Sequence, residues 1–149
     1  MGCPDGIATL DQATGKMAQY EGKMTMIVLH KISYDRIKNS FKDCNVCDEY
    51  AEPIINYLVY GFNPGAFFTA VIANDFAGAM SRSHPANQVQ ELKYLVHWMN
   101  NCMPRVSWGG YDIFYAWIDA SEEYRRKILE DHKLIYTPHE ETWEAISKV

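Results

Sequence analysis

The chain has 149 residues, of which 48% are hydrophobic and 22% are charged. This balance is typical of one globular domain with a real core and excludes wholesale disorder. The formal net charge is -5 and no run of lysine or arginine occurs, which excludes non-specific binding to a phosphate backbone. No apolar run approaches the roughly 18 residues that span a bilayer. Neither nucleic acid nor a membrane is therefore an expected partner.

The N-terminal part carries few helix signals. Residues 1–23 are rich in glycine and polar side chains without a period, which predicts a loose arm ahead of a single helical domain over 24–149. The run 24–32 is apolar but short, so a strand and the first turns of a helix both fit it. Ser33 can cap a short helix after this run. No basic region followed by an apolar stretch occurs at the N-terminus, so no secretory signal is expected.

Proline and glycine mark the next helices. Glu52-Pro53 favours a helix start, because proline is tolerated in the first turn. Gly61 can end that helix in a left-handed conformation. Asn63-Pro64 favours another start, and the apolar pattern after it predicts a continuous central helix over 64–82.

The predicted central helix is apolar on nearly every side. Small side chains recur on one stripe, where another helix or another copy of the chain can approach closely: Ala66, Ala70, Ala73, Ala77 and Ser81. Large apolar side chains cover the rest, so we expect a buried helix at the centre of a bundle. Asn74 and Asp75 lie side by side within it, and buried polar groups need partners.

Capping and turn signals divide the C-terminal half into further helices. His84-Pro85 predicts one helix start, and Trp108-Gly109-Gly110 predicts a turn before an aromatic helix over 111–120. Ser121 can cap the next helix. Thr137-Pro138-His139-Glu140 is a capping box that starts a short final helix. The predicted fold class is mainly α, a compact helical bundle.

The order of these signals resembles that of a family of small accessory proteins of tailed bacteriophages. The shared motifs cover about half the chain and read Glu52-Pro53, Gly61, Pro64-Gly65-Ala66-Phe67, Thr69-Ala70-Val71-Ile72-Ala73-Asn74-Asp75, Trp108-Gly109 and Ala116-Trp117. The resemblance implies a phage product that acts in the cytoplasm of the bacterial host. It implies a role in counter-defence or in binding a host factor, with sequestration of a small nucleotide signal as one form. It carries over no catalytic residues.

Asn74 and Asp75 form the first candidate site. A carboxylate within an apolar helix costs several kcal/mol unless it is paired. Asp75 could hold a loop through backbone N–H groups, or pair with Arg82 or Arg105. Alternatively, Asn74 and Asp75 could line a pocket and bind hydroxyl or amine groups of a ligand.

The predicted helix start at Asn63 and Gly65 is the second candidate site. Free N–H groups at a helix start favour phosphate, and glycine lets an oxyanion approach closely. An ordinary helix end explains the same residues. No glycine-rich phosphate loop with its lysine occurs, so an NTPase is not expected.

Arginines beside aromatic side chains form the third candidate site. Arg82, His84, Arg105 and Trp108 occupy predicted helix ends or loops, and an aromatic plane beside an arginine suits a nucleotide. Surface arginines near a core tryptophan are the alternative interpretation. In an up-and-down bundle residues near 82–86 lie at one end and residues 101–110 at the other, so these side chains need not converge within one subunit. In a homo-oligomer they could converge.

The cysteines and histidines permit three interpretations. Cys44 and Cys47 have the spacing of half a zinc site or of a redox pair, and Cys102 with His97 could form a nucleophile and base. Ordinary packed or exposed thiols of a cytoplasmic protein are the favoured interpretation. Because no second pair stands at a diagnostic distance, no metal and no cofactor is expected.

These observations favour a non-catalytic binding protein whose partner is a host protein or a small nucleotide-like ligand. A small enzyme is the first alternative, either metal-dependent or nucleotide-cleaving, built from Asp75 and His84 or His97. A structural or virion-associated protein that assembles through its helices is the second.

Overall fold

The computed structural model describes residues 29–83 and 89–147, and within them all regular structure is helical. The elements in chain order are α1 (Lys31–Asp43), α2 (Asp48–Tyr60), α3 (Ala66–Ile72), α4 (Phe76–Arg82), α5 (Val89–Cys102), the 3-10 turn η1 (Arg105–Ser107), α6 (Tyr111–Asp119), α7 (Glu122–Asp131) and α8 (Pro138–Ser147). The predicted mainly α class is confirmed.

Two N-terminal predictions fall mostly or wholly outside the described residues. The arm over 1–23 lies outside them, as does most of the strand considered over 24–32. The described end of that run is helical from Lys31. The cap is His30, whose Nδ1 accepts a hydrogen bond from the Ile32 N–H at 3.3 Å, so capping by Ser33 is wrong. Ser33 is buried and accepts from the Tyr136 N–H instead.

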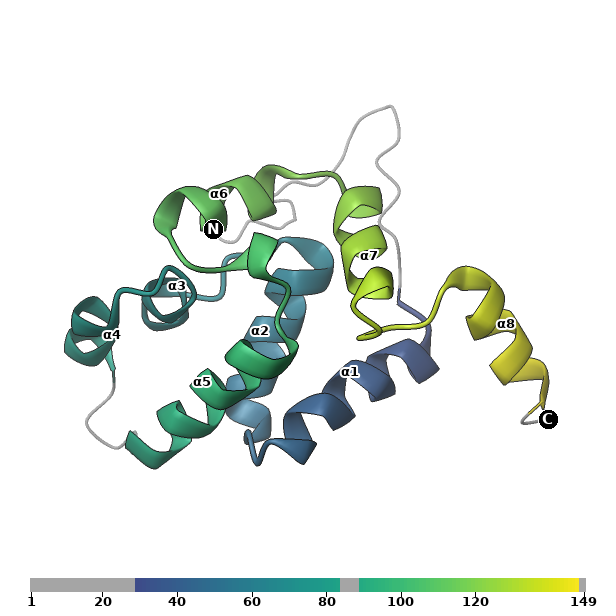
Figure 1. The fold of residues 1–149 in the computed structure, drawn as a ribbon, viewed down its shortest axis with the longest axis horizontal. Coiled ribbons are helices and arrows are strands. Elements are labelled where there is room, and N and C mark those ends of the chain that lie inside the picture. Colours follow the sequence, from purple (N-terminus) through teal and green to yellow (C-terminus); the bar gives the residue numbers. More distant parts are fainter. Residues whose placement is uncertain (1–28, 84–88, 148–149) are drawn as a thin grey trace.

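Helix α2, and not the segment 64–82, is central in the molecule. It contacts α1, α6 and α7, and Figure 1 shows it between these elements, with α3 and α4 at one end and α8 projecting at the other. Its buried residues are Tyr50, Ala51, Ile54, Ile55, Tyr57, Leu58 and Val59. It begins at Asp48, so Pro53 lies inside the helix and not in its first turn. Asp48 and Glu49 suit the positive end of the helix dipole there.

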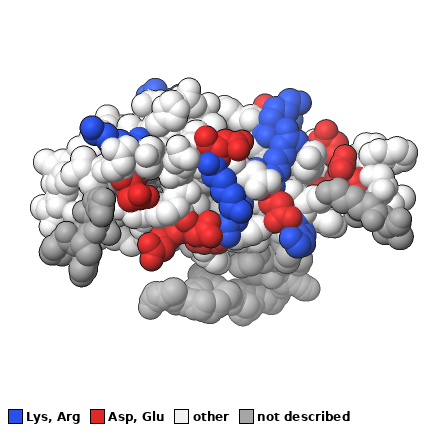
Figure 2. Space-filling model, turned by 90° about the horizontal axis from the view of Figure 1, so that it is seen from below, with Lys and Arg blue, Asp and Glu red and all other residues white. Residues whose placement is uncertain are grey.

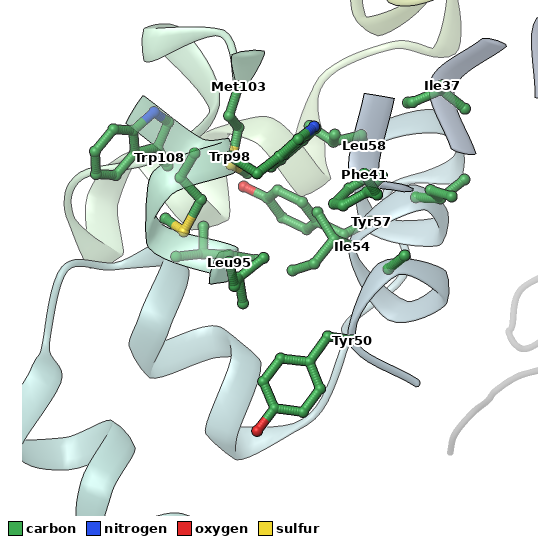
Figure 3. Close-up of a cluster of buried hydrophobic side chains, with 14 of the residues drawn as sticks. Ile37, Phe41, Tyr50, Ile54, Tyr57, Leu58, Leu95, Trp98, Met103 and Trp108 are labelled. Atoms are coloured by element: carbon green, nitrogen blue, oxygen red, sulfur yellow. The ribbon is translucent and has the colours of Figure 1, made fainter. Parts of the chain in front are cut away.

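Aromatic side chains fill the core around α2 (Figure 3). Phe41 of α1 stacks on Trp98 of α5 with ring centroids 3.8 Å apart, and Tyr57 stacks on Phe114 of α6 at 5.1 Å. The Tyr57 hydroxyl donates to the Ser107 carbonyl at 2.7 Å, and burial raises its pKa above the ordinary tyrosine value. A tyrosine can be fully buried when its hydroxyl finds a hydrogen-bond partner, as the Tyr57 hydroxyl does here.

Gly61 ends α2 in the left-handed conformation, with φ 70°, as predicted. The guanidinium of Arg125 lies against it, and a Cβ at this position would come within 2.8 Å of Nη1. Gly61→Ala is therefore expected to lower the free energy of unfolding by about 1–2 kcal/mol from backbone strain, and further from this collision. Gly65→Ala, at φ 97° with no neighbour within 4 Å, reports strain alone in the same chemical denaturation experiment. A loss at Gly61 within the about 1–2 kcal/mol expected from strain alone would show that Arg125 does not crowd Gly61.

The predicted continuous helix over 64–82 is wrong, because the chain reverses at Asn74. Helix α3 ends at Ile72, Asn74 has φ 64°, and Asp75 is the N-cap of α4. The Asn74 N–H donates to the Val71 carbonyl at 3.0 Å, and the Asp75 N–H donates to the Ala70 carbonyl at 2.8 Å. This paired bonding is a Schellman cap. Asparagine tolerates the left-handed conformation and aspartate is a preferred N-cap, so these residues favour a helix break.

The break also overturns the predicted burial of this segment. Asn74 is exposed, and Phe76 and Met80 of α4 are 39% and 46% exposed. In the stripe of small side chains, Ala70 and Ala73 are buried, whereas the other members are exposed: Ala66, Ala77 and Ser81. The stripe is therefore not one packing face.

Candidate functional site

The turn between α3 and α4 is joined to the segment that precedes α6. The Gly109 N–H donates to the Ile72 carbonyl at 2.8 Å. Asp75 accepts at both carboxylate oxygens: Oδ1 from the Gly78 N–H at 3.0 Å and Oδ2 from the Tyr111 hydroxyl at 2.6 Å. Since Asp75 and Tyr111 are 36 positions apart, this bond holds distant segments together.

The charge of Asp75 is stabilised by its donors. The hydrogen bond from Tyr111 lowers the pKa of Asp75 most, followed by the Gly78 N–H, and the nearby Arg82 guanidinium lowers it further. The same bond raises the pKa of Tyr111. At neutral pH the carboxyl of Asp75 is ionised and the phenol of Tyr111 keeps its proton. The ionised carboxylate accepts the hydrogen bond that the protonated phenol donates, so the bond favours both of these states.

An arginine lies on a tryptophan immediately before α6. The guanidinium carbon of Arg105 is 4.5 Å from the centre of the Trp108 ring. The Trp108 side chain is buried, and its Nε1 has no hydrogen-bond partner among the described residues. Arg105 is exposed. The pair thus presents a guanidinium over an aromatic face at the surface.

The structure brings several of the predicted site residues together. Asp75 caps α4 and Arg82 lies two turns further along the same helix, and both side chains lie over Gly78. Arg82 is therefore close enough to act electrostatically on Asp75 and Tyr111. Arg82 and Tyr111 therefore lie near each other within one copy of the chain. Arg105 and Trp108 lie in the segment joined to this turn through Gly109.

Other predicted site residues lie elsewhere. Asn63 Oδ1 accepts from the Gly65 N–H at 2.8 Å, so this asparagine closes a local turn. The N-cap of α3 is Gly65 and the helix begins at Ala66, so Asn63 is not the cap and Pro64 is not the first helical residue. His84 lies outside the described residues, and α5 is described from Val89.

Tyr111 and Tyr115 were missed by the sequence interpretation. They are 41% and 55% exposed on α6, while Phe114 and Trp117 of the same helix are buried. Their i,i+4 spacing, out of phase with the buried pair, is the signal that could have revealed them. We call the group formed by Arg82, Arg105, Tyr111 and Tyr115 the tyrosine–arginine surface.

Asp75→Ala is expected to lower the melting temperature at neutral pH, because it removes the N-cap of α4 and the acceptor of Tyr111. Asp75→Asn should lower it less, since the amide oxygen can still accept one bond. The folded pKa of Asp75 is lowered, so its stabilisation exists above the ordinary carboxyl pKa of about 4 and is lost as pH falls through the folded value. Melting curves from pH 7 to pH 2 should therefore bring wild type and Asp75→Asn together at the acid end. A neutral-pH Asn variant as stable as wild type would contradict this structural role.

The cysteines of the described chain are free and half-buried. Burial is the main cause that raises the pKa of both Cys47 and Cys102, which makes them weak nucleophiles at neutral pH. Within residues 29–83 and 89–147, no group of three or more His, Cys, Asp or Glu side chains is placed to hold a metal ion.

A separate pocket of about 400 Å³ lies beside α8, which projects from the body of the molecule (Figure 1). Its lining residues are Tyr136, His139, Glu140, Trp143 and Glu144. Trp143 and the neighbouring Ile146 are 65% and 64% exposed. None of the sequence-predicted site residues lines this pocket.

The surface charges and helices bear on the class of partner. Figure 2 shows Lys and Arg side chains mixed with Asp and Glu over the middle of one face, without a basic stripe. In the part of the chain that the structure describes, every helix is too short or too polar to cross a bilayer. The fold and site are those of a small helical protein with an exposed aromatic and arginine surface.

No protein-family model, no curated protein and no solved structure matches the chain.

Proposed function

We propose that this chain is a non-catalytic binding protein, an accessory factor of the phage type that engages a host protein in the bacterial cytoplasm. The observation that carries the proposal is the tyrosine–arginine surface. Tyr111 is exposed and yet held by its 2.6 Å bond to Asp75, with Tyr115 one turn further along α6. Tyrosine and arginine dominate the energetics of protein interfaces, and a side chain already held in place loses less entropy on binding.

The same geometry weighs against the enzymatic alternative. Both carboxylate oxygens of Asp75 accept hydrogen bonds that hold the fold, so neither is free to act as a general base. Cys102 has a raised pKa. His97 is exposed, and its ring nitrogens lie 3.3 Å and 3.4 Å from the amide nitrogen of Asn101 on its own helix. A nucleophile with an oriented base is therefore not assembled among these residues.

Sequestration of a small nucleotide is the second candidate, because Arg105 lies over Trp108 and no ion pair engages it among the described residues. Arg82 and Arg105 could contact phosphates, while an exposed tyrosine ring could stack on a base. This interpretation predicts a thermal shift with nucleotides, since a ligand that binds the folded state raises its stability.

A photo-crosslinking amino acid at Tyr115 tests the host-protein proposal in bacterial cells. We expect one host protein to be captured from this position, and we expect Tyr111→Ala to abolish both the capture and the binding of the purified partner. The same crosslinker at Asn39, an exposed residue of α1, is the matched control. Equal capture at both positions, or binding that survives Tyr111→Ala, would refute the proposal that the tyrosine–arginine surface binds the partner.

Purified protein distinguishes the remaining alternatives. A panel of cyclic and linear nucleotides should leave the melting temperature unchanged if the partner is a protein. A shift without product formation would support sequestration, and turnover would support an enzyme. Large assemblies in size-exclusion chromatography, lost on substitution of an exposed helix face, would support the structural role.

A further inference from the structure

The pocket beside α8 combines aromatic rings with carboxylates. Trp143 and Tyr136 supply the rings, while Glu140 and Glu144 supply the acids. Glu140 Oε1 accepts from the Thr137 N–H at 2.9 Å, and this bond is the main cause that lowers its pKa. No hydrogen bond or ion pair engages the Glu144 carboxylate within the described residues. The lowered pKa of Glu140 favours its ionised form. Glu144, whose carboxylate has no partner among residues 29–83 and 89–147, lies with it beside an exposed indole.

A cation from the protein itself already lies on one of these rings. The guanidinium carbon of Arg36, in α1, is 4.5 Å from the centre of the Tyr136 ring. Attraction of cations to aromatic faces is strongest for tryptophan, and Trp143 is the more exposed ring of this pocket. In the described chain, no cation is recorded over the Trp143 ring.

We propose that this pocket binds a lysine or arginine side chain of a partner protein. The cation would lie on the Trp143 ring and pair with Glu144, and an apolar neighbour in the partner would pack on Ile146. Charge complementarity selects this occupant. A second copy docked through α8 would oppose Glu140 and Glu144 with the same acids, because α8 offers no described lysine or arginine. Arg36 and Lys133 act on Glu140, so they weaken the attraction there. Among the described residues no cation pairs with Glu144.

Short synthetic peptides test the site on the full chain. The probes carry one isoleucine followed by lysine, arginine or the neutral isostere norleucine. Trp143 is the reporter, since the other tryptophans, Trp98, Trp108 and Trp117, are at most 7% exposed. We expect the cationic peptides to change Trp143 fluorescence at millimolar concentration and low salt, and norleucine to bind about fivefold more weakly or not at all. Equal response to norleucine, or no response to any peptide, overturns the proposal.

Paired substitutions move the affinity in opposite directions. Glu144→Gln should weaken lysine-peptide binding about fivefold, whereas Arg36→Gln should strengthen it by removing a like charge. Glu123→Gln, an exposed acid on α7, is the control for net charge, and Tyr111→Ala should leave peptide binding unchanged. Binding that responds equally to Glu144→Gln and Glu123→Gln would show general electrostatic attraction and would refute a site. Calorimetry with Trp143→Ala completes the test, with loss of binding expected.

Discussion

Arg125→Ala is expected to lower the free energy of unfolding by about 3–4 kcal/mol, a large effect for one residue. Arg125 is 3% exposed. Its Nη1 donates to the carbonyls of Ala120 at 2.5 Å, Trp117 at 3.3 Å and Ile118 at 3.3 Å, and its Nε donates to Val59 at 3.4 Å. Alanine would remove this donor from all four carbonyls, at the ends of α2 and α6. The Trp117 carbonyl would keep the Ala120 N–H, at 3.2 Å, as a donor.

Burial makes the charged form of Arg125 less favourable. Desolvation is the main cause that lowers its pKa, although Glu122 and Tyr57 oppose this shift. The helix carbonyls supply the negative ends of dipoles that compensate the buried cation. Removing the side chain therefore loses donors for buried acceptors as well as packing.

Chemical denaturation checks this prediction. Arg125→Lys should lose less than alanine, because an ammonium can still donate to some of the carbonyls, but it lacks the planar fork. Lys127→Ala is the control on the same helix: its side chain is 69% exposed in an i,i+4 pair with Asp131, and its loss should be small beside that of Arg125→Ala. An Arg125→Ala variant within about 1 kcal/mol of wild type would contradict the structural role.

Trp98→Ala should destabilise the protein by about 4 kcal/mol. Trp98 is fully buried, stacks on Phe41 and donates from Nε1 to the Ser40 hydroxyl at 3.0 Å. The substitution leaves a large cavity between α1 and α5, and neighbouring side chains cannot fill it without strain.

Trp98→Phe separates the contributions to this effect. It keeps an aromatic ring against Phe41 but removes volume and the donor to Ser40, so a loss of about 1–2 kcal/mol is expected. Trp143→Ala is the matched control, because Trp143 is 65% exposed; it should change stability by at most about 0.5 kcal/mol. The comparison requires denaturation curves with similar slopes. Similar losses for Trp98→Ala and Trp143→Ala would contradict the burial of Trp98.

Local chemistry made several helix ends predictable. Ser121 accepts from the Tyr124 N–H at 3.1 Å, as its position before an acidic turn predicted. Thr137 and Glu140 form the reciprocal bonds of the predicted capping box. Gly61 ends α2 as expected. Each of these signals involves residues close in sequence. The preference for a helix end at these positions therefore does not depend on the rest of the fold.

The candidate site was predictable only in part. Asp75, Arg82, Arg105 and Trp108 were selected from their chemistry, but the partner of Asp75 was expected to be a loop N–H or an arginine. The Gly78 N–H belongs to the first turn of α4 and not to a loop, and Arg82 acts on Asp75 through its charge. The Tyr111 hydroxyl was not foreseen, because a bond across 36 positions depends on how α4 and α6 meet.

The sequence by itself determined a helical protein and the residues at which several of its helices end, because capping and left-handed turns are local properties of the backbone. Only the tertiary structure decided which helix is central. An apolar pattern shows that a face can be buried, not that another element covers it. The segment 64–82 is mostly apolar, yet it breaks at Asn74 and leaves Phe76 and Met80 exposed. Helix α2 is buried instead, because α1, α6 and α7 pack around it.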